Sequence, residues 1–121
     1  MLSRRFAALL AIFLAVEGVW ELFSPVVFGV FTSNPLHGGI HILLGIAGVV
    51  AVTKGTARGY LLGVGGLLLV VGILWFVPGA STLVVSLFNV NFAVACFNIA
   101  VGVISLVIGL SAPRAVAASV P

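Results

Sequence analysis

Four ionisable side chains could support chemistry in this sequence, because they lie among long runs of apolar residues: Glu17, Glu21, His37 and His41. The two glutamates are four residues apart, as are the two histidines, so each pair lies on one face of a helix. Carboxylates and imidazoles bind transition metals such as zinc or iron, relay protons and hold small polar molecules. A histidine can also ligate haem, although no attachment motif is present. We favour hydrogen bonds between the carboxyl and imidazole groups, which would lock two helices in register.

The composition places these side chains inside a membrane. Of the 121 residues, 63% are hydrophobic and 6% are charged, whereas soluble domains are about half apolar and about a quarter charged. The apolar residues form four blocks, each close to the roughly 17 to 25 residues that span a bilayer. The predicted spans are about 6–23, 36–53, 59–77 and 92–110. We therefore expect an all-α fold, a polytopic integral membrane four-helix bundle made of two tandem helical hairpins, as a single transmembrane domain over residues 1–121.

Basic residues indicate how the chain crosses the membrane. All five lie outside the apolar blocks: Arg4, Arg5, Lys54, Arg58 and Arg114. With four crossings they fall on one side, which the positive-inside rule makes cytoplasmic, and the opposite loops 24–35 and 78–91 contain no charged residue. We expect a multi-pass protein of the cell inner membrane with both the N-terminus and the C-terminus in the cytoplasm. The net charge of +3 comes without a basic cluster, so we expect no nucleic-acid partner.

The predicted spans also indicate how the four ionisable residues pair. Consecutive spans are antiparallel, and at about 1.5 Å per residue Glu17 lies about 12 Å inward from the end of its span and His41 about 9 Å. Glu21 and His37 lie about 6 Å and about 3 Å deep. A carboxylate at mid-span costs about 2.5 to 3.5 kcal/mol to insert and therefore needs a partner. We predict that Glu17 faces His41 and that Glu21 faces His37.

The second half of the chain aligns weakly with the first, which predicts an internal repeat of one helical hairpin. Phe31-Thr-Ser-Asn34 aligns with Phe88-Asn-Val-Asn91. Further aligned pairs are Gly18 with Gly72 and Gly45 with Gly102. Two-span copies share one orientation, so we expect a pseudo-symmetry axis along the membrane normal, unlike the inverted repeats of many transporters.

Glycines recur along one face of the second span and one face of the third: Gly38, Gly45 and Gly48, then Gly59, Gly63 and Gly66. In lipid, small residues let helix backbones approach closely enough for packing to hold the helices together. We expect both stripes to pack inside the bundle, with a dimerisation seam as the alternative.

No other motif in the sequence specifies a reaction. There is no nucleophile with an oriented base and no glycine-rich phosphate loop, and the single Cys96 lies inside the fourth span. We therefore expect no catalytic residue, no enzyme activity and no cofactor, and a structural or interaction role. The alternative is a metal-binding or proton-handling membrane protein with Glu17, Glu21, His37 and His41 as metal ligands; a channel or carrier comes third. Expected partners are the lipid bilayer and either further copies of the chain or another membrane protein.

The start of the second span carries a recognisable pattern, Leu-His-x-x-hydrophobic-His-x-x-x-Gly-x-x-Gly. It is formed by Leu36, His37, His41, Gly45 and Gly48. In this pattern the chain resembles a bacterial family of four-span membrane proteins known as domain of unknown function 4383. The resemblance implies a bacterial inner-membrane protein and brings no established activity.

The second hairpin matches that family less fully. Val90-Asn91 and Gly102 look like the family's second-hairpin motif. Asn98 stands where the resemblance implies a second-copy histidine, and Val94 and Ala95 stand where it implies an Asp-Asn pair. The four ionisable residues therefore have no counterparts in the second hairpin, and we expect one site per chain.

Overall fold

A computed structural model describes residues 2–113 of the chain. Its elements are α1 (Leu2–Phe23), β1 (Val26–Val27), β2 (Phe31–Thr32), α2 (Pro35–Thr53), α3 (Ala57–Leu74), α4 (Ala80–Phe88) and α5 (Phe92–Ser111). Four of these helices, α1, α2, α3 and α5, are long and apolar enough to cross a membrane. These four helices match the four predicted spans, although the third helix ends at Leu74 rather than near residue 77.

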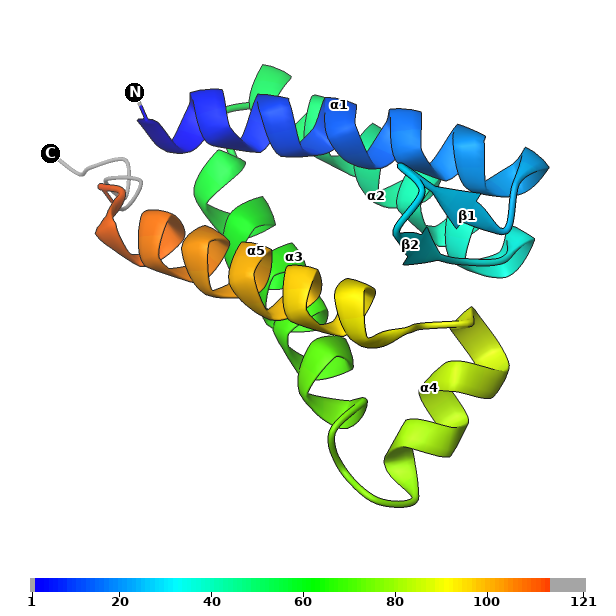
Figure 1. Ribbon diagram of the computed structural model, residues 1–121. Coiled ribbons are helices and arrows are strands. Elements are labelled where there is room, and N and C mark those ends of the chain that lie inside the picture. The colour runs from blue at the N-terminus through cyan, green and yellow to red at the C-terminus, as the bar shows by residue number, and fades with distance from the viewer. Residues whose placement is uncertain (1, 114–121) are drawn as a thin grey trace, which may run out of the picture.

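The four long helices form two antiparallel hairpins, α1 with α2 and α3 with α5, and the helices pack more closely within a hairpin than between hairpins (Figure 1). The N-terminus, the turn at 54–56 and the end of α5 gather at one end of the molecule, which we call the terminal end. Residues 24–34 and 75–91 form the opposite end, called the loop end. Arg4 and Arg58 line one hollow at the terminal end, whereas Arg114 lies outside the described residues.

Glycines of α2 set the close approach of the first hairpin. A Cβ added to Gly45 would lie 2.8 Å from Ala11 O, and one added to Gly38 would lie 2.7 Å from Gly18 O. One added to Gly48 would lie 2.5 Å from the Cβ of Ala11. These distances leave no room for a side chain, so the prediction that this stripe packs inside the bundle is confirmed.

The corresponding prediction for α3 is wrong. A Cβ added to Gly59, Gly63 or Gly66 would meet no atom of residues 2–113 within 4 Å. Gly65 and Gly72 face α5 instead, and a Cβ on Gly72 would lie 2.8 Å from Ala95 O. The reason is the rotation of α3 about its axis, which glycine spacing alone does not determine.

Aligned glycines of the two hairpins make the same kind of contact. Gly18 approaches the side chain and backbone of Ile42, and Gly72 approaches those of Ile99. Likewise, Gly45 sits against the backbone of α1 and Gly102 against the backbone of α3. Within each hairpin, the two helices are therefore packed through equivalent glycine contacts.

Three elements at the loop end, β1, β2 and α4, lie in segments that the sequence showed only as uncharged loops. β1 and β2 form a small antiparallel hairpin in which Val26 pairs with Thr32 and Val27 with Phe31. Its turn uses Phe28 and Gly29, which both have positive φ. The short helix α4 leads from α3 toward α5 (Figure 1).

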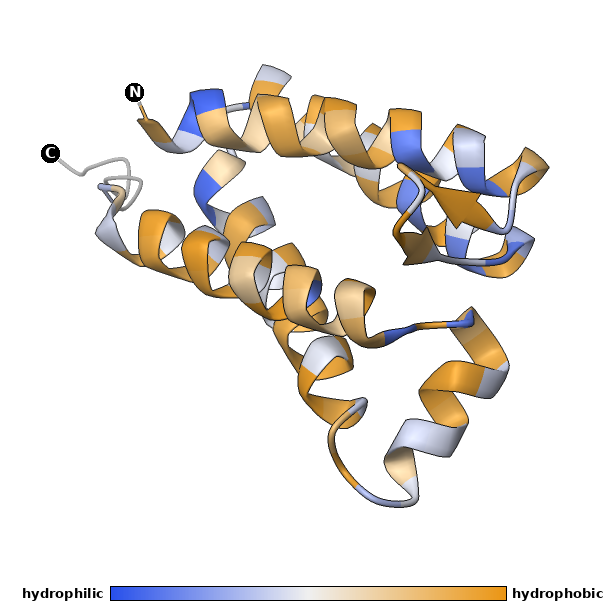
Figure 2. Ribbon diagram, viewed as in Figure 1, coloured by the Kyte–Doolittle hydropathy of each residue, from blue (hydrophilic) through white to orange (hydrophobic). Residues whose placement is uncertain are grey.

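The outer surface of the long helices is apolar. Leu9 on α1, Leu43 on α2 and Leu110 on α5 are 68%, 67% and 66% exposed. Hydrophobic colouring runs along all four long helices in Figure 2, and hydrophilic residues gather toward the two ends of the molecule. Such a surface suits lipid or another membrane protein rather than water.

Candidate functional site

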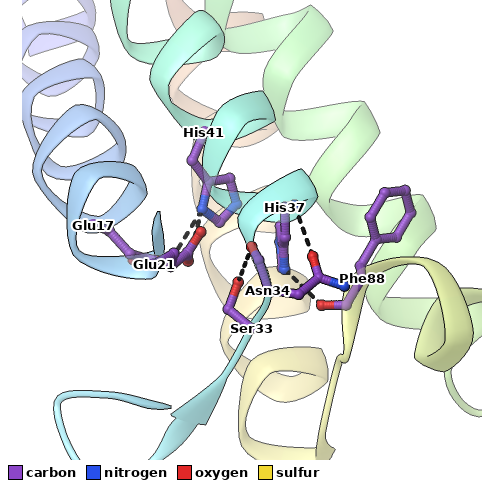
Figure 3. Close-up of polar contacts among 7 residues, drawn as sticks. All are labelled: Glu17, Glu21, Ser33, Asn34, His37, His41 and Phe88. Atoms are coloured by element: carbon purple, nitrogen blue, oxygen red, sulfur yellow. Dashed lines mark hydrogen bonds and ion pairs between the residues drawn. The ribbon is translucent and has the colours of Figure 1, made fainter. Parts of the chain in front are cut away.

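Three of the four ionisable residues meet at one point between α1 and α2, toward the loop end. His41 Nδ1 lies 3.3 Å from Glu17 Oε1 and 3.0 Å from Glu21 Oε1 (Figure 3). Glu17, Glu21 and His41 are 6%, 2% and 4% exposed, so all three are buried. The predicted proximity of Glu17 and His41 is confirmed, and the single imidazole of His41 contacts both carboxylates. We call Glu17, Glu21 and His41 the Glu/His cluster.

The predicted pairing of Glu21 with His37 is wrong. A Cβ added to Gly38 would lie 2.9 Å from Glu21 Cβ, so the glutamate sits directly over that glycine. At about 100° per residue, His41 lies about 60° around the helix from Gly38, whereas His37 lies about 100° around it on the same side. His41 is therefore the nearer of the two to Glu21. The prediction compared only the depths of the residues in the membrane and ignored their angular positions around α2.

His37 instead joins the first hairpin to α4. Its Nδ1 donates to Phe88 O at 3.1 Å, at the last residue of α4. The Asn34 side chain caps α2 by accepting from His37 N at 2.9 Å, which fixes the start of the helix that carries both histidines. The ring centroids of His37 and His41 are 4.2 Å apart. His37 therefore lies beside the cluster without contacting either carboxylate directly.

The sequence did not indicate the role of Phe88, because residue types in an uncharged loop do not show which backbone carbonyl will accept a hydrogen bond from a distant side chain. A usable signal was nevertheless present. Gly79 precedes the apolar run 80–88 and Asn89 follows it in a left-handed conformation with φ of 53°. Gly or Asn just past an apolar segment is typical of a helix end. The signal would have predicted a short helix in this loop, although not its contact with His37.

Two buried oxygens of the cluster lack partners. Glu17 Oε2 and Glu21 Oε2 have no hydrogen-bond partner among the described residues. Leaving a buried polar atom unsatisfied costs about 1 to 3 kcal/mol, and more for a charged group. With both carboxylates ionised and the imidazole protonated, the cluster would carry a net charge of −1 in a low-dielectric region. It is therefore short of one positive charge or proton.

Two hollows adjoin the cluster on different sides. One of about 400 Å³ lies at the loop end, where Glu21, Ser33, Asn34 and Asn89 are among its lining residues. The other, of about 80 Å³, lies between the two hairpins and is lined mainly by apolar residues, together with His37, His41 and Asn98. Glu21 thus lines the hollow at the loop end, whereas His37 and His41 line the inner cavity.

The second hairpin has no equivalent cluster. The residues aligned with those of the first hairpin are Val71, Trp75, Val94 and Asn98. Trp75 Nε1 donates to Val90 O at 3.1 Å. Within residues 2–113, Glu17, Glu21 and His41 form the one group of three potential metal ligands whose donor atoms lie within 4.8 Å of one another. His37 was expected to belong to this set, and the structure places it outside the group.

The fold and these buried polar contacts define a multi-pass α-helical membrane protein. The family model described as Domain of unknown function (DUF4383) matches residues 23–111, and the chain belongs to that family. No match was found among curated proteins or among solved structures. The matched region contains both histidines but begins after Glu17 and Glu21, so membership of the family carries no information about the glutamates.

Proposed function

We propose that this protein is a small structural or interaction protein of the bacterial inner membrane, without catalytic activity. The observation that carries the proposal is the use of polar side chains at the loop end to fasten one hairpin to the other. Asn34 Nδ2 donates to Leu87 O at 2.8 Å, and Asn91 Nδ2 donates to Val30 O at 2.9 Å. A binding or catalytic site would leave such polar groups free to contact a ligand. In this protein the amide groups of Asn34 and Asn91 instead hold the two hairpins together.

A second pair of contacts supports the same interpretation. Thr32 Oγ1 donates to Asn89 O at 2.6 Å, and Asn89 Nδ2 donates to Ser33 O at 2.9 Å. Each hairpin thus supplies donors and acceptors to the other. The aligned Asn34 and Asn91 act reciprocally, as expected if one ancestral hairpin was duplicated.

The proposed orientation places the terminal end in the cytoplasm. Arg4 and Arg58 lie there together, and the loop end bears no Lys or Arg. The positive-inside rule assigns such an end to the cytoplasmic side. The apolar lateral surface would then contact lipid and, in an interaction role, a second copy or another membrane protein.

Reconstitution into proteoliposomes separates this role from proton handling and from transport. A proton gradient imposed across vesicles that contain the protein should decay as slowly as across protein-free vesicles. Glu17→Gln provides the matched control, because it removes a charge while keeping the shape of the side chain. A faster decay that disappears in Glu17→Gln would replace the structural role with proton transfer through the cluster.

A further inference from the structure

We propose that Glu17, Glu21 and His41 bind one divalent transition-metal ion, best matched by zinc, which joins α1 to α2 near the loop end. Such a site goes beyond a structural or interaction role, because it gives the protein a ligand. The proposed site also differs from the four metal ligands predicted from the sequence, because His37 is not one of the ligands.

The separations of the donor atoms suit zinc. Zinc binds histidine nitrogen and carboxylate oxygen at about 2.0 to 2.2 Å, with tetrahedral geometry. Two ligands of a tetrahedron at that bond length lie about 3.3 to 3.6 Å apart. His41 Nδ1 lies 3.3 Å from Glu17 Oε1 and 3.0 Å from Glu21 Oε1, and the three residues offer donor atoms that all lie within 4.8 Å of one another. Side-chain rotations that adjust these separations would admit the ion.

Charge and unsatisfied oxygens independently favour a cation. Two carboxylates, a neutral imidazole and a divalent ion sum to zero charge, which is the state that costs least to bury. The ion would lie beside Glu17 Oε2 and Glu21 Oε2, the two buried oxygens without partners among residues 2–113. Calcium requires six to eight oxygen ligands and magnesium a near-ideal octahedron. One nitrogen with two carboxylates therefore favours a transition metal.

Water at the loop end completes the coordination. Three protein ligands leave a fourth position open, as in zinc sites that retain a water molecule. Glu21 is among the residues that line the hollow of about 400 Å³ at this end, so this hollow lies next to the proposed site. His37 donates to Phe88 O and supports the His41 ring at a centroid distance of 4.2 Å. It therefore acts as a positioning residue.

Zinc titration of tag-free protein in mild detergent tests the site. Competition with a chromophoric chelator should show one zinc per chain, measured in a Cys96→Ala background so that the exposed thiol on α5 does not contribute. Replacing an outer-shell partner typically weakens binding by about 10- to 100-fold. We expect Glu21→Gln and His41→Gln to weaken it by more than about 100-fold, and His37→Gln by about 10- to 100-fold.

A second readout keeps the proposal testable if a variant does not fold. Zinc should raise the melting temperature of the Cys96→Ala protein in proportion to occupancy, because a ligand that binds only the folded state stabilises it. Bound cobalt should give the intense visible absorption of a four-coordinate site. Failure of the Cys96→Ala protein to bind zinc would overturn the proposal. So would equal affinities in folded Glu21→Gln, or a loss in His37→Gln as large as that in His41→Gln.

Discussion

At the residue scale, His41 has two carboxylate partners of unequal closeness. Glu21 Oε1 is 0.3 Å nearer to the imidazole than Glu17 Oε1, the difference between 3.0 and 3.3 Å. Glu21 is also the less exposed of the two glutamates. We therefore expect the contact between Glu21 and His41 to contribute more to stability than the contact between Glu17 and His41.

A double-mutant cycle with Glu21→Gln and His41→Leu measures this contribution. In membrane proteins, interhelical hydrogen bonds measured by such cycles average about 0.6 kcal/mol and reach about 1.7 kcal/mol. We predict a coupling energy within this range, read from unfolding in mild detergent with a chelator present. A cycle with Glu21→Gln and His37→Leu serves as the control and should show weaker coupling. Equal coupling in the two cycles would contradict the assignment of partners.

Sequence reasoning found the residues of this cluster but only part of its geometry. Depth counting placed Glu17 opposite His41 correctly, because two antiparallel helices must match in level. It failed for Glu21 because pairing also depends on which face of α2 meets α1. That face is set by the close approach of Gly18 and Gly38, where a Cβ on Gly18 would lie 2.6 Å from Gly38 O.

At the element scale, the close approach of α1 and α2 predicts which glycines tolerate substitution. In Gly18→Ala the new methyl group would lie 2.6 Å from Gly38 O and 2.8 Å from Ile42 N, so the helices must separate. We expect a loss of about 1 to 3 kcal/mol in the free energy of unfolding. Unfolding in detergent, followed by circular dichroism, measures it.

Gly63→Ala is the matched control on α3, because its new methyl group would meet no described atom within 4 Å. Alanine has the higher helix propensity, so this variant should be neutral or slightly more stable. Similar losses in Gly18→Ala and Gly63→Ala would contradict the account, because they would show that the close packing at Gly18 does not determine the result.

The sequence predicted the four long helices, whose hydropathy is high along their whole length, but not the short helix α4. Runs as long and apolar as Phe92–Ser111 can scarcely be anything but spans. The nine-residue helix Ala80–Phe88 is too short for that criterion and contains no charge. Asn89 is a local signal for its end, but the contacts of that end with a distant segment, such as the bond from Asn34 to Leu87 O, leave no local pattern.

At the scale of the whole molecule, the reciprocal asparagine contacts predict that the two hairpins separate most easily when the loop end is weakened. Asn34 has two roles, since it caps α2 and also donates to Leu87 O. Serine preserves the cap, but its side chain is too short to replace the long-range donor. Asn34→Ser therefore isolates the contact between hairpins.

We expect Asn34→Ser to speed amide hydrogen exchange at residues 80–91 while leaving exchange in the first turns of α2 unchanged. Asn34→Ala should speed exchange in both regions, because it also removes the cap at a typical cost of about 1 kcal/mol. Mass spectrometry of exchanged peptides distinguishes the two patterns. Unchanged exchange at 80–91 in both variants would show that these bonds do not hold the hairpins together.

The central claim is that the chain crosses the membrane four times, with the terminal end in the cytoplasm and the Glu/His cluster near the opposite face. Cysteine labelling in a Cys96→Ala background tests it most directly. Val30→Cys and Ser86→Cys would place exposed thiols at the loop end, and Thr53→Cys one at the terminal end. A membrane-impermeant maleimide should label Val30→Cys and Ser86→Cys in bacteria whose outer membrane has been permeabilised. It should label Thr53→Cys only after the inner membrane is permeabilised, and labelling of Thr53→Cys in cells with an intact inner membrane would contradict the account.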